Sequence, residues 1–144
     1  MTQISAYLTF DGNCREALTF YKECFDADLN LQTVEGSPME EQCPPGMKHL
    51  ILHAILIKDD FILMATDMVE PEGFIKGNNI SLSVMCGSEK EINDYFAKFS
   101  VGGEILDPLR EQFWGAIFGC VVDKFGIRWM FNFEKSEPII QTNI

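Results

Sequence analysis

The feature that most constrains this chain is an internal repeat. The stretch LTFDGNCREALTFYKECF, residues 8–25, aligns with LSVMCGSEKEINDYFAKF, residues 82–99, with five apolar matches at a constant offset of 74 residues. Self-similarity at one fixed offset indicates that a single supersecondary unit occurs twice. A chain of 144 residues is long enough for both copies within one domain of ordinary size.

Both copies open with an alternating run of apolar and polar residues, ISAYLTF (4–10) and NISLSVM (79–85). A period of two predicts a strand with one buried face. A helical stripe follows in each copy, and three further strand-like runs come after it. These runs are residues 27–36, 47–57 and 61–68 in the first copy and 102–109, 115–122 and 127–133 in the second.

The helix starts are marked by capping patterns. Asn13 with Glu16, and Ser88 with Glu91, have the spacing in which a cap side chain and a glutamate satisfy free backbone N–H groups. The Gly102–Gly103 pair is placed to end the second helix. Two capped helices argue against one long antiparallel sandwich, which has no place for them.

The sequence therefore predicts an α+β fold of two tandem βαβββ modules. The first module takes residues 1–69, a linker takes 70–78, and the second module takes 79–144. The acidic, proline-rich stretch 36–46 is expected to be a surface loop, long enough to cover a cavity.

Charge and cysteine content exclude several classes. A formal net charge of −11 opposes binding to nucleic acid or to an anionic membrane. We find no basic leader and no apolar run of membrane-spanning length, so a cytoplasmic protein is expected. Five cysteines without C-x-x-C spacing indicate reduced thiols. Neither a P-loop nor a dinucleotide-binding glycine motif occurs.

Three blocks, YLTFDGNCREALTFY, LHAILIKDDFILMATD and FWGAIFGCVVDKFGIRWMFN, together resemble the PhnB-like branch of the vicinal oxygen chelate superfamily, which contains glyoxalases, bleomycin resistance proteins and dioxygenases. The resemblance runs along nearly the whole chain, and the F-W-G, D-K-F-G and R-W spacing of the last block is its most distinctive part. It implies mixed sheets curled into a half-open barrel, helices outside, a cavity for a small organic molecule, and a homodimer.

The last block mixes large and small residues, as a bent strand lining a cavity would. We expect Trp114 and Trp129 in the cavity wall, and Met64 and Met130 in contact with the ligand. A structure with both indoles remote from any cavity would contradict the first expectation.

Metal-dependent relatives bind one divalent ion through residues of the first and last strand of each module. The matching positions here hold hydroxyls, an amide and thioethers, which are poor ligands for hard divalent ions: Ser5, Tyr7, Asn79, Ser81, Met64 and Met130. No resident metal or other cofactor is therefore expected, although a divalent ion recruited by substrate stays open.

The chain has two histidines, His49 and His53. The run HLILHAILI predicts a strand, where four residues span ~13 Å, too far for one ion to bridge. His53 is the candidate catalytic residue, as an acid–base or ligand-contacting group, and a histidine bonded to a backbone carbonyl is the equal alternative.

Asp67 and Asp123 are the carboxylates best placed for a site, and each is also explained by bonds to turn or strand-end backbone. Arg110 and Arg128 suit an anionic ligand or surface ion pairs.

Three functions remain open: a small-molecule-binding protein, a lyase, isomerase or dioxygenase-type enzyme, and a protein that sequesters a drug or metabolite. All three require a cavity.

Overall fold

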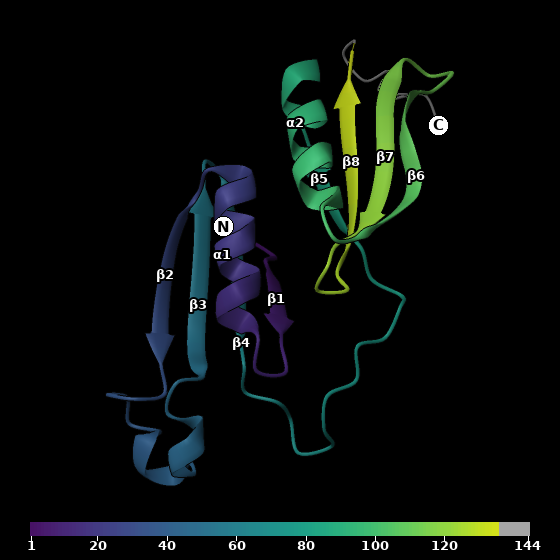
Figure 1. Ribbon diagram of the computed structural model, residues 1–144. Coiled ribbons are helices and arrows are strands. Elements are labelled where there is room, and N and C mark those ends of the chain that lie inside the picture. Colours follow the sequence, from purple (N-terminus) through teal and green to yellow (C-terminus); the bar gives the residue numbers. More distant parts are fainter. Residues whose placement is uncertain (136–144) are drawn as a thin grey trace. The chain divides into compact units, whose positions relative to one another are not determined.

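The computed structural model describes residues 1–135. Over this range the chain forms two α-helices, eight strands and two short 3-10 helices (Figure 1). In chain order these are β1 (Ala6–Thr9), α1 (Cys14–Phe25), β2 (Asp28–Thr33), η1 (Glu40–Gln42), η2 (Pro45–Met47), β3 (Ile51–Lys58), β4 (Phe61–Thr66), β5 (Leu82–Met85), α2 (Glu89–Ser100), β6 (Glu104–Glu111), β7 (Ala116–Val122) and β8 (Arg128–Glu134).

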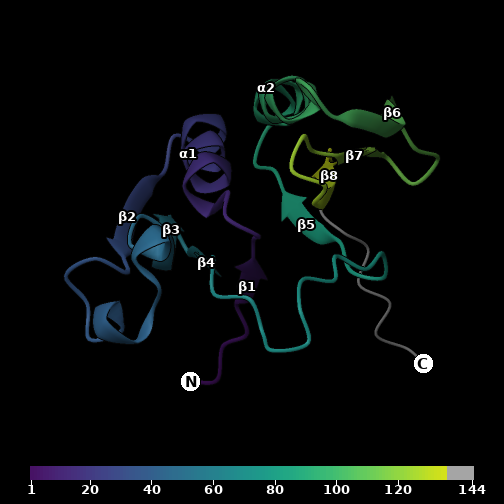
Figure 2. The same ribbon diagram turned by 60° about the horizontal axis from the view of Figure 1, so that its bottom comes forward.

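The first four strands form one mixed sheet in the order β1-β4-β3-β2. The first strand pairs in parallel with the last, while β4 with β3 and β3 with β2 are antiparallel. Helix α1 lies on one side of this sheet (Figure 2). Its apolar stripe, with Leu18, Tyr21 and Phe25, is buried, as are Leu56 and Leu63 of the sheet. The helix thus covers one face of the sheet.

The second sheet has the same arrangement, in the order β5-β8-β7-β6, with β5 parallel to β8. Helix α2 covers one face of it (Figure 2). The Phe99 ring packs between Trp129 and Phe131. Its centroid lies 4.8 Å from that of Trp129 and 5.2 Å from that of Phe131. At Gly119 a Cβ would lie 2.7 Å from the Phe96 ring, so glycine lets the helix approach the sheet closely.

The predicted α+β class is confirmed, with two βαβββ modules, a helix outside each sheet, and neither sheet closed into a barrel over residues 1–135. The chain divides into two compact units, Met1–Lys76 and Gly77–Ile144. The linker bounds 70–78 stay a prediction. Residues 136–144 of the predicted second module lie outside the described residues. No helix in the described part of the chain is long and apolar enough to cross a membrane.

One capping prediction is confirmed and one is wrong. The Ser88 hydroxyl accepts the Glu91 N–H at 3.1 Å, and the Glu91 carboxylate accepts the Gly87 N–H at 3.2 Å. Asn13 makes no capping hydrogen bond with its side chain. The carboxylate of Asp67 takes that place, because it reaches the start of α1 from the end of β4. A residue 53 positions away thus replaces the local cap.

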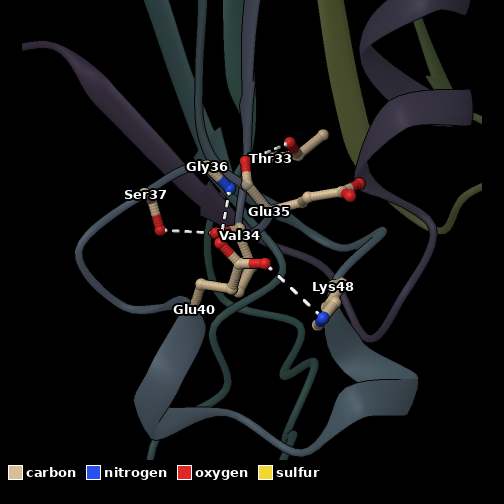
Figure 3. Close-up of polar contacts among 7 residues, drawn as sticks. All are labelled: Thr33, Val34, Glu35, Gly36, Ser37, Glu40 and Lys48. Atoms are coloured by element: carbon tan, nitrogen blue, oxygen red, sulfur yellow. Dashed lines mark hydrogen bonds and ion pairs between the residues drawn. The ribbon is translucent and has the colours of Figure 1, made fainter.

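The connection between β2 and β3 is the predicted surface loop, and it is held by its own contacts (Figure 3). The Glu40 carboxylate accepts the Gly36 N–H at 3.0 Å and pairs with Lys48 at 3.5 Å. The Ser37 hydroxyl donates to the Val34 carbonyl at 2.6 Å. Segments that close on their own side chains in this way are compact surface loops, often with a functional role.

Candidate functional site

Each sheet has a second face, which its own helix does not cover. We call these the open faces. Alternation along the strands of the first sheet directs one set of side chains to its open face. Its centre is Tyr7 of β1, Met64 of β4, and His53 and Ile55 of β3. Around it lie Thr9, Asp28, Asn30, Gln32, Ile57, Ile62 and Thr66.

A polar pair marks the centre of this face. The Tyr7 hydroxyl and Nδ1 of His53 are 3.2 Å apart, within hydrogen-bonding distance. Their ring centroids are 5.8 Å apart with planes tilted by 39°, so the rings meet at their polar edges and are not stacked. Tyr7 is 51% exposed and His53 is half-buried, which leaves the pair accessible. A phenol and an imidazole in contact can orient a ligand or transfer a proton.

Met64 lies between the two strands that carry this pair. It is opposite Tyr7 on β1 and opposite Ile55 on β3. An apolar, polarisable thioether and the isoleucine beside it therefore lie next to the polar pair. Sites for small organic molecules commonly combine apolar walls with a few polar groups in this way.

The open face of the second sheet places Met130 at the corresponding point. Met130 lies opposite Ser83 of β5 and Cys120 of β7, as Met64 lies opposite Tyr7 and Ile55. Asn132 lies two positions after Met130 on β8, and its side-chain amide donates to the Glu134 carboxylate at 3.1 Å. This face therefore has the thioether but no phenol–imidazole pair.

The donors at the expected metal positions do not fit a hard divalent ion. Tyr7 and Met64 are side by side in the first sheet, and Ser83 and Met130 are side by side in the second. Ser83, and not the expected Ser81, is the residue on β5 opposite Met130. Neutral hydroxyls and thioethers bind such ions poorly. Within residues 1–135, no three His, Cys, Asp or Glu side chains are grouped to hold a metal.

His49 lies outside the strand predicted for it. The backbone N–H of Leu50 donates to Met47 at 3.1 Å, and Lys48 accepts from Glu35 at 3.0 Å, so this segment turns before β3 begins at Ile51. His53 therefore is the one histidine on the strand, and it contributes alone to the open face.

The two indoles have different environments. Trp129 is 3% exposed, packs on Phe99 of α2, and donates its N–H to Asp123 at 2.8 Å. It therefore belongs to the core on the helix side of the second sheet. Trp114 is 51% exposed in the turn between β6 and β7, and its ring meets Phe113 edge to face at 4.9 Å.

Both candidate carboxylates hold backbone structure. Asp67 accepts the N–H groups of Gly12, Cys14 and Ile51 at 2.8–3.0 Å. It therefore ties the turn after β1 to the start of β3, the two strands that carry Tyr7 and His53. Each bond is backbone to side chain, which agrees with the structural alternative considered for this residue.

Asp123 also holds backbone structure, but in the last hairpin turn of the second unit. It accepts the N–H groups of Phe125 and Ile127 at 2.8 and 3.0 Å, and the Trp129 indole N–H. The arginines are engaged on the surface, with Arg110 paired to Asp107 and Arg128 3.5 Å from the Asn78 carbonyl.

All five cysteines are free, as expected, and four are buried. Burial raises the pKa of the Cys14 thiol to about 12, and the nearby Asp67 carboxylate acts in the same direction. Burial, with a smaller contribution from Glu91, raises the pKa of Cys86 to about 12. Burial also raises the pKa of Cys120 on the second open face. Such thiols are poor nucleophiles, so they are structural residues.

Tyr7 is the residue that sequence reasoning undervalued. It was considered as a metal ligand, whereas in the structure it is the hydrogen-bonding partner of His53, 46 residues away. The signal that could have found it is the alternation of ISAYLTF, which directs Tyr7 to the face opposite the helix.

Comparison with known proteins gives a consistent assignment. The sequence model of the 3-demethylubiquinone-9 3-methyltransferase family matches residues 2–131. Protein YjdN of Escherichia coli K12 is 32% identical, over 94% of this chain and 97% of its own. The crystal structure of PA1353 from Pseudomonas aeruginosa has a TM-score of 0.81 at 36% identity, covering 93% of this chain and 98% of that one.

The PhnB protein of Bacillus cereus superposes with a TM-score of 0.75 at 28% identity, over 92% of this chain and 99% of its own. A glyoxalase/bleomycin resistance protein/dioxygenase family enzyme from Burkholderia phytofirmans gives a TM-score of 0.61 at 9% identity, over 89% and 96% of the two chains. At that identity the likeness concerns the fold alone.

Proposed function

Because this chain belongs to the family described as 3-demethylubiquinone-9 3-methyltransferase, a PhnB-like family with the glyoxalase/bleomycin resistance/dioxygenase fold, we propose that it binds a small organic molecule on the open face of its first sheet. The observation that carries the proposal is the hydrogen bond between Tyr7 and His53. It places two polar atoms at the centre of that face, among side chains that carry no charge.

The proposed site consists of Tyr7, His53, Met64 and Ile55. In the second unit, Met130 on the open face of the second sheet and Trp114 in an exposed turn stay separate predictions of ligand-contacting residues. Trp129 is left out of the site because its indole is packed on Phe99 and bonded to Asp123.

The proposal is a binding function, although the family carries a methyltransferase description. Doubly wound nucleotide-binding folds place their ligand at a switch point between parallel βαβ units. In this chain each sheet has one parallel pair, and its other strands are antiparallel. The sheets therefore lack the geometry on which that mode of cofactor binding depends.

A screen by thermal shift tests the proposal, because a ligand that binds only the folded state raises the melting temperature. Metal-stripped protein is screened against divalent ions, small organic acids, quinones and cationic drugs. We expect at least one organic compound to raise the melting temperature of the wild type and to lose most of that effect in His53→Gln and Tyr7→Phe. Hits that are unaffected by both substitutions would contradict the site.

An enzyme that uses the same pair is the second candidate, and the observation that favours it is again the Tyr7–His53 contact, since a hydrogen-bonded phenol and imidazole suit acid–base catalysis. Here His53 would be the catalytic residue. Exchange of a ligand proton with deuterated solvent, detected by NMR and lost in His53→Gln, separates turnover from binding.

We also propose a homodimer in the cytoplasm. The family membership supports the dimer, and the five free thiols agree with a reducing compartment. Sedimentation velocity at micromolar concentration tests the first part, and a single monomeric species would contradict it. Fractionation of cells that express the protein tests the second.

A further inference from the structure

We propose that Thr66 is a positioning residue of the candidate site, because its hydroxyl holds the β3 backbone at the point that directs His53 towards Tyr7. This inference rests on the proposed function, since it names a residue that acts on the same site. Thr66 needs no contact with a ligand for this role. It acts through the peptide group that joins Leu52 to His53.

Strand β3 carries one extra residue just before His53. On the neighbouring strand β2, Gln32 lies opposite His53. The next residue, Thr33, lies opposite Ile51, so Leu52 is left between the two pairs. A residue inserted in this way is a β-bulge, which bends the strand and changes the direction of the side chains beside it.

The bulge changes the face of the sheet to which β3 directs its side chains. In an unbroken strand Ile51 would share the open face with His53 and Ile55, because side chains two positions apart lie on the same face. Ile51 is instead completely buried, whereas His53 and Ile55 are partly exposed. The direction of His53 therefore depends on how the bulge is held.

Thr66, the last residue of β4, holds the bulge from the other side. Its buried hydroxyl donates to the Leu52 carbonyl at 2.7 Å and accepts the Met68 N–H at 3.0 Å. The Ile51 carbonyl is farther from the hydroxyl, at 3.4 Å, and accepts the Asp67 N–H at 2.8 Å. A hydroxyl has a single hydrogen to donate, so the shorter distance assigns it to the bulge residue.

The carbonyl that Thr66 holds belongs to the same peptide group as the His53 nitrogen. A peptide group is planar, so fixing its carbonyl also fixes the plane from which the His53 backbone continues. The Tyr7 hydroxyl and Nδ1 of His53 are 3.2 Å apart, at the upper end of the usual hydrogen-bond range. A small rotation of that plane would therefore break the contact.

The second unit differs at the equivalent position, which is Asn132 two residues after Met130. The Asn132 amide bonds along its own strand, to Glu134 at 3.1 Å. Strand β7 pairs with β8 in unbroken register over Ala116–Val122. The bond to a bulge carbonyl is therefore found on the open face that also carries the phenol–imidazole pair.

NMR of the imidazole nitrogens tests the inference without a ligand. Spectra are recorded at about pH 8, where an ordinary imidazole is mostly neutral, on untagged His49→Gln protein, in which His53 is the one histidine left. In Tyr7→Phe we expect the Nδ1 and Nε2 resonances to move, because the partner of one nitrogen decides which of them carries the proton. In Thr66→Val, which keeps the volume and loses the hydroxyl, we expect them to move in the same direction.

Two variants give the control. Thr66→Ser keeps the hydroxyl and should retain the wild-type imidazole resonances. Thr33→Val removes a hydroxyl on the other side of the bulge, which donates to the Glu35 carbonyl at 3.0 Å, and should retain them too. If Thr66→Val does not fold, Thr66→Cys replaces it, because a thiol is only a weak donor, and a shift in the same direction is again expected.

The outcomes separate the two proposals. Wild-type resonances in Thr66→Val, with changed ones in Tyr7→Phe, would overturn the role of Thr66 and leave the binding site standing. An equal shift in Thr33→Val would also overturn it, since any hydroxyl near the bulge would then have the same effect. If Tyr7→Phe itself leaves the resonances unchanged, the contact that carries the proposed function is not formed in solution, and the proposed function fails.

Discussion

The two units of this protein share a topology but stabilise it with different polar residues. In the first, Asp67 follows the last strand and accepts three backbone N–H groups from the start of α1 and from β3. In the second, Asp123 lies in the last hairpin turn and bonds that turn and an indole. The two copies therefore share the order and pairing of their strands, but their buried polar contacts differ.

The open faces differ in the same way. Met64 and Met130 occupy equivalent positions, but the residue beside Met64 is Tyr7, bonded to His53, and the residue beside Met130 is Ser83. The repeated module thus supplies two similar surfaces, and the phenol–imidazole pair lies on one of them. Substitutions that act on one unit and have a counterpart in the other can test this comparison.

The largest effect is expected in the reactivity of the thiols. Cys14 and Cys86 lie at or just before the helix of each unit, and in both the pKa is raised from 9.0 to about 12. Such a shift leaves roughly a thousandfold less thiolate at pH 8. We expect iodoacetamide to modify Cys43, which is partly exposed, well before either of them. Peptide mapping over time measures the order.

Rapid labelling of Cys14 but not Cys86 would show that the first unit opens more readily than the second. The sign of the pH effect on stability follows from the same shifts. A thiol with a folded pKa above its unfolded value of 9.0 ionises first in the unfolded state. The free energy of unfolding therefore falls as the pH rises from 9 towards 12.

Substitution of the two buried aspartates should affect the units selectively. Asp67→Ala leaves the N–H groups of Gly12, Cys14 and Ile51 without their acceptor, and we expect a loss of about 3–5 kcal/mol. Asp123→Ala should cost about 2–4 kcal/mol, because the Phe125 and Ile127 N–H donors are only partly buried. Urea denaturation measures both losses.

Amide hydrogen exchange then locates the damage. Asp67→Ala should lower protection in β3 and β4, and Asp123→Ala in β7 and β8. The matched Asp→Asn variants keep one acceptor oxygen and should lose less. Equal loss of protection in both units from either substitution would contradict separate stabilisation.

A smaller effect is expected where the helix leads into the following strand. The residue before β2 is Ala27, whereas the residue before β6 is Gly103, where a Cβ would lie 2.3 Å from the Val122 carbonyl oxygen. Gly103→Ala should therefore destabilise the protein by about 1–3 kcal/mol, since backbone has to move. Gly87→Ala, at a site with open space around it, is the control and should change stability by less than about 0.5 kcal/mol.

The smallest effect is expected in the loop between β2 and β3, whose counterpart between β6 and β7 is a short turn. Glu40→Gln removes the partly exposed ion pair with Lys48 and keeps an oxygen for the Gly36 N–H, so stability should fall by less than about 1 kcal/mol. Glu40→Ala removes both contacts and should also speed hydrogen exchange at Gly36. Equal exchange in the two variants would contradict the role given to the carboxylate.

Features encoded by neighbouring residues could be predicted from the sequence. The strand–helix–strand order of both copies, the Ser88 cap and the end of α2 at Ser100, two residues before Gly102, depend on residues within one turn or one strand. The Asn13 cap was wrong because the carboxylate of the distant Asp67 takes its place, and the strand position of His49 was wrong because backbone bonds of the loop hold that segment in a turn. Local patterns carry no information about such competitors.

The same distinction between local patterns and distant contacts applies to the candidate site. Alternation was enough to place His53 and Met64 on strands, but the contact of His53 with Tyr7 depends on strands β1 and β3 lying on either side of β4. Trp129 is an aromatic residue of the kind expected in a cavity wall, but it is next to Met130 on β8 and so points to the helix side, where its indole donates to Asp123. Tertiary pairing thus decides which aromatic residues are available to a ligand.

The parallel pairing of first and last strands has a consequence for synthesis of the chain. Ala6 can pair only after Leu63 has been synthesised, and Leu82 only after Trp129. These partners are 57 and 47 residues apart in the chain. The extra closure entropy of the longer loop is only about 0.2 kcal/mol, so closing the two loops costs nearly the same free energy. While the ribosome adds the intervening residues, β1 and β5 have no partner, and unpaired strand edges invite aggregation. Strands of four residues with alternating exposure keep that risk small.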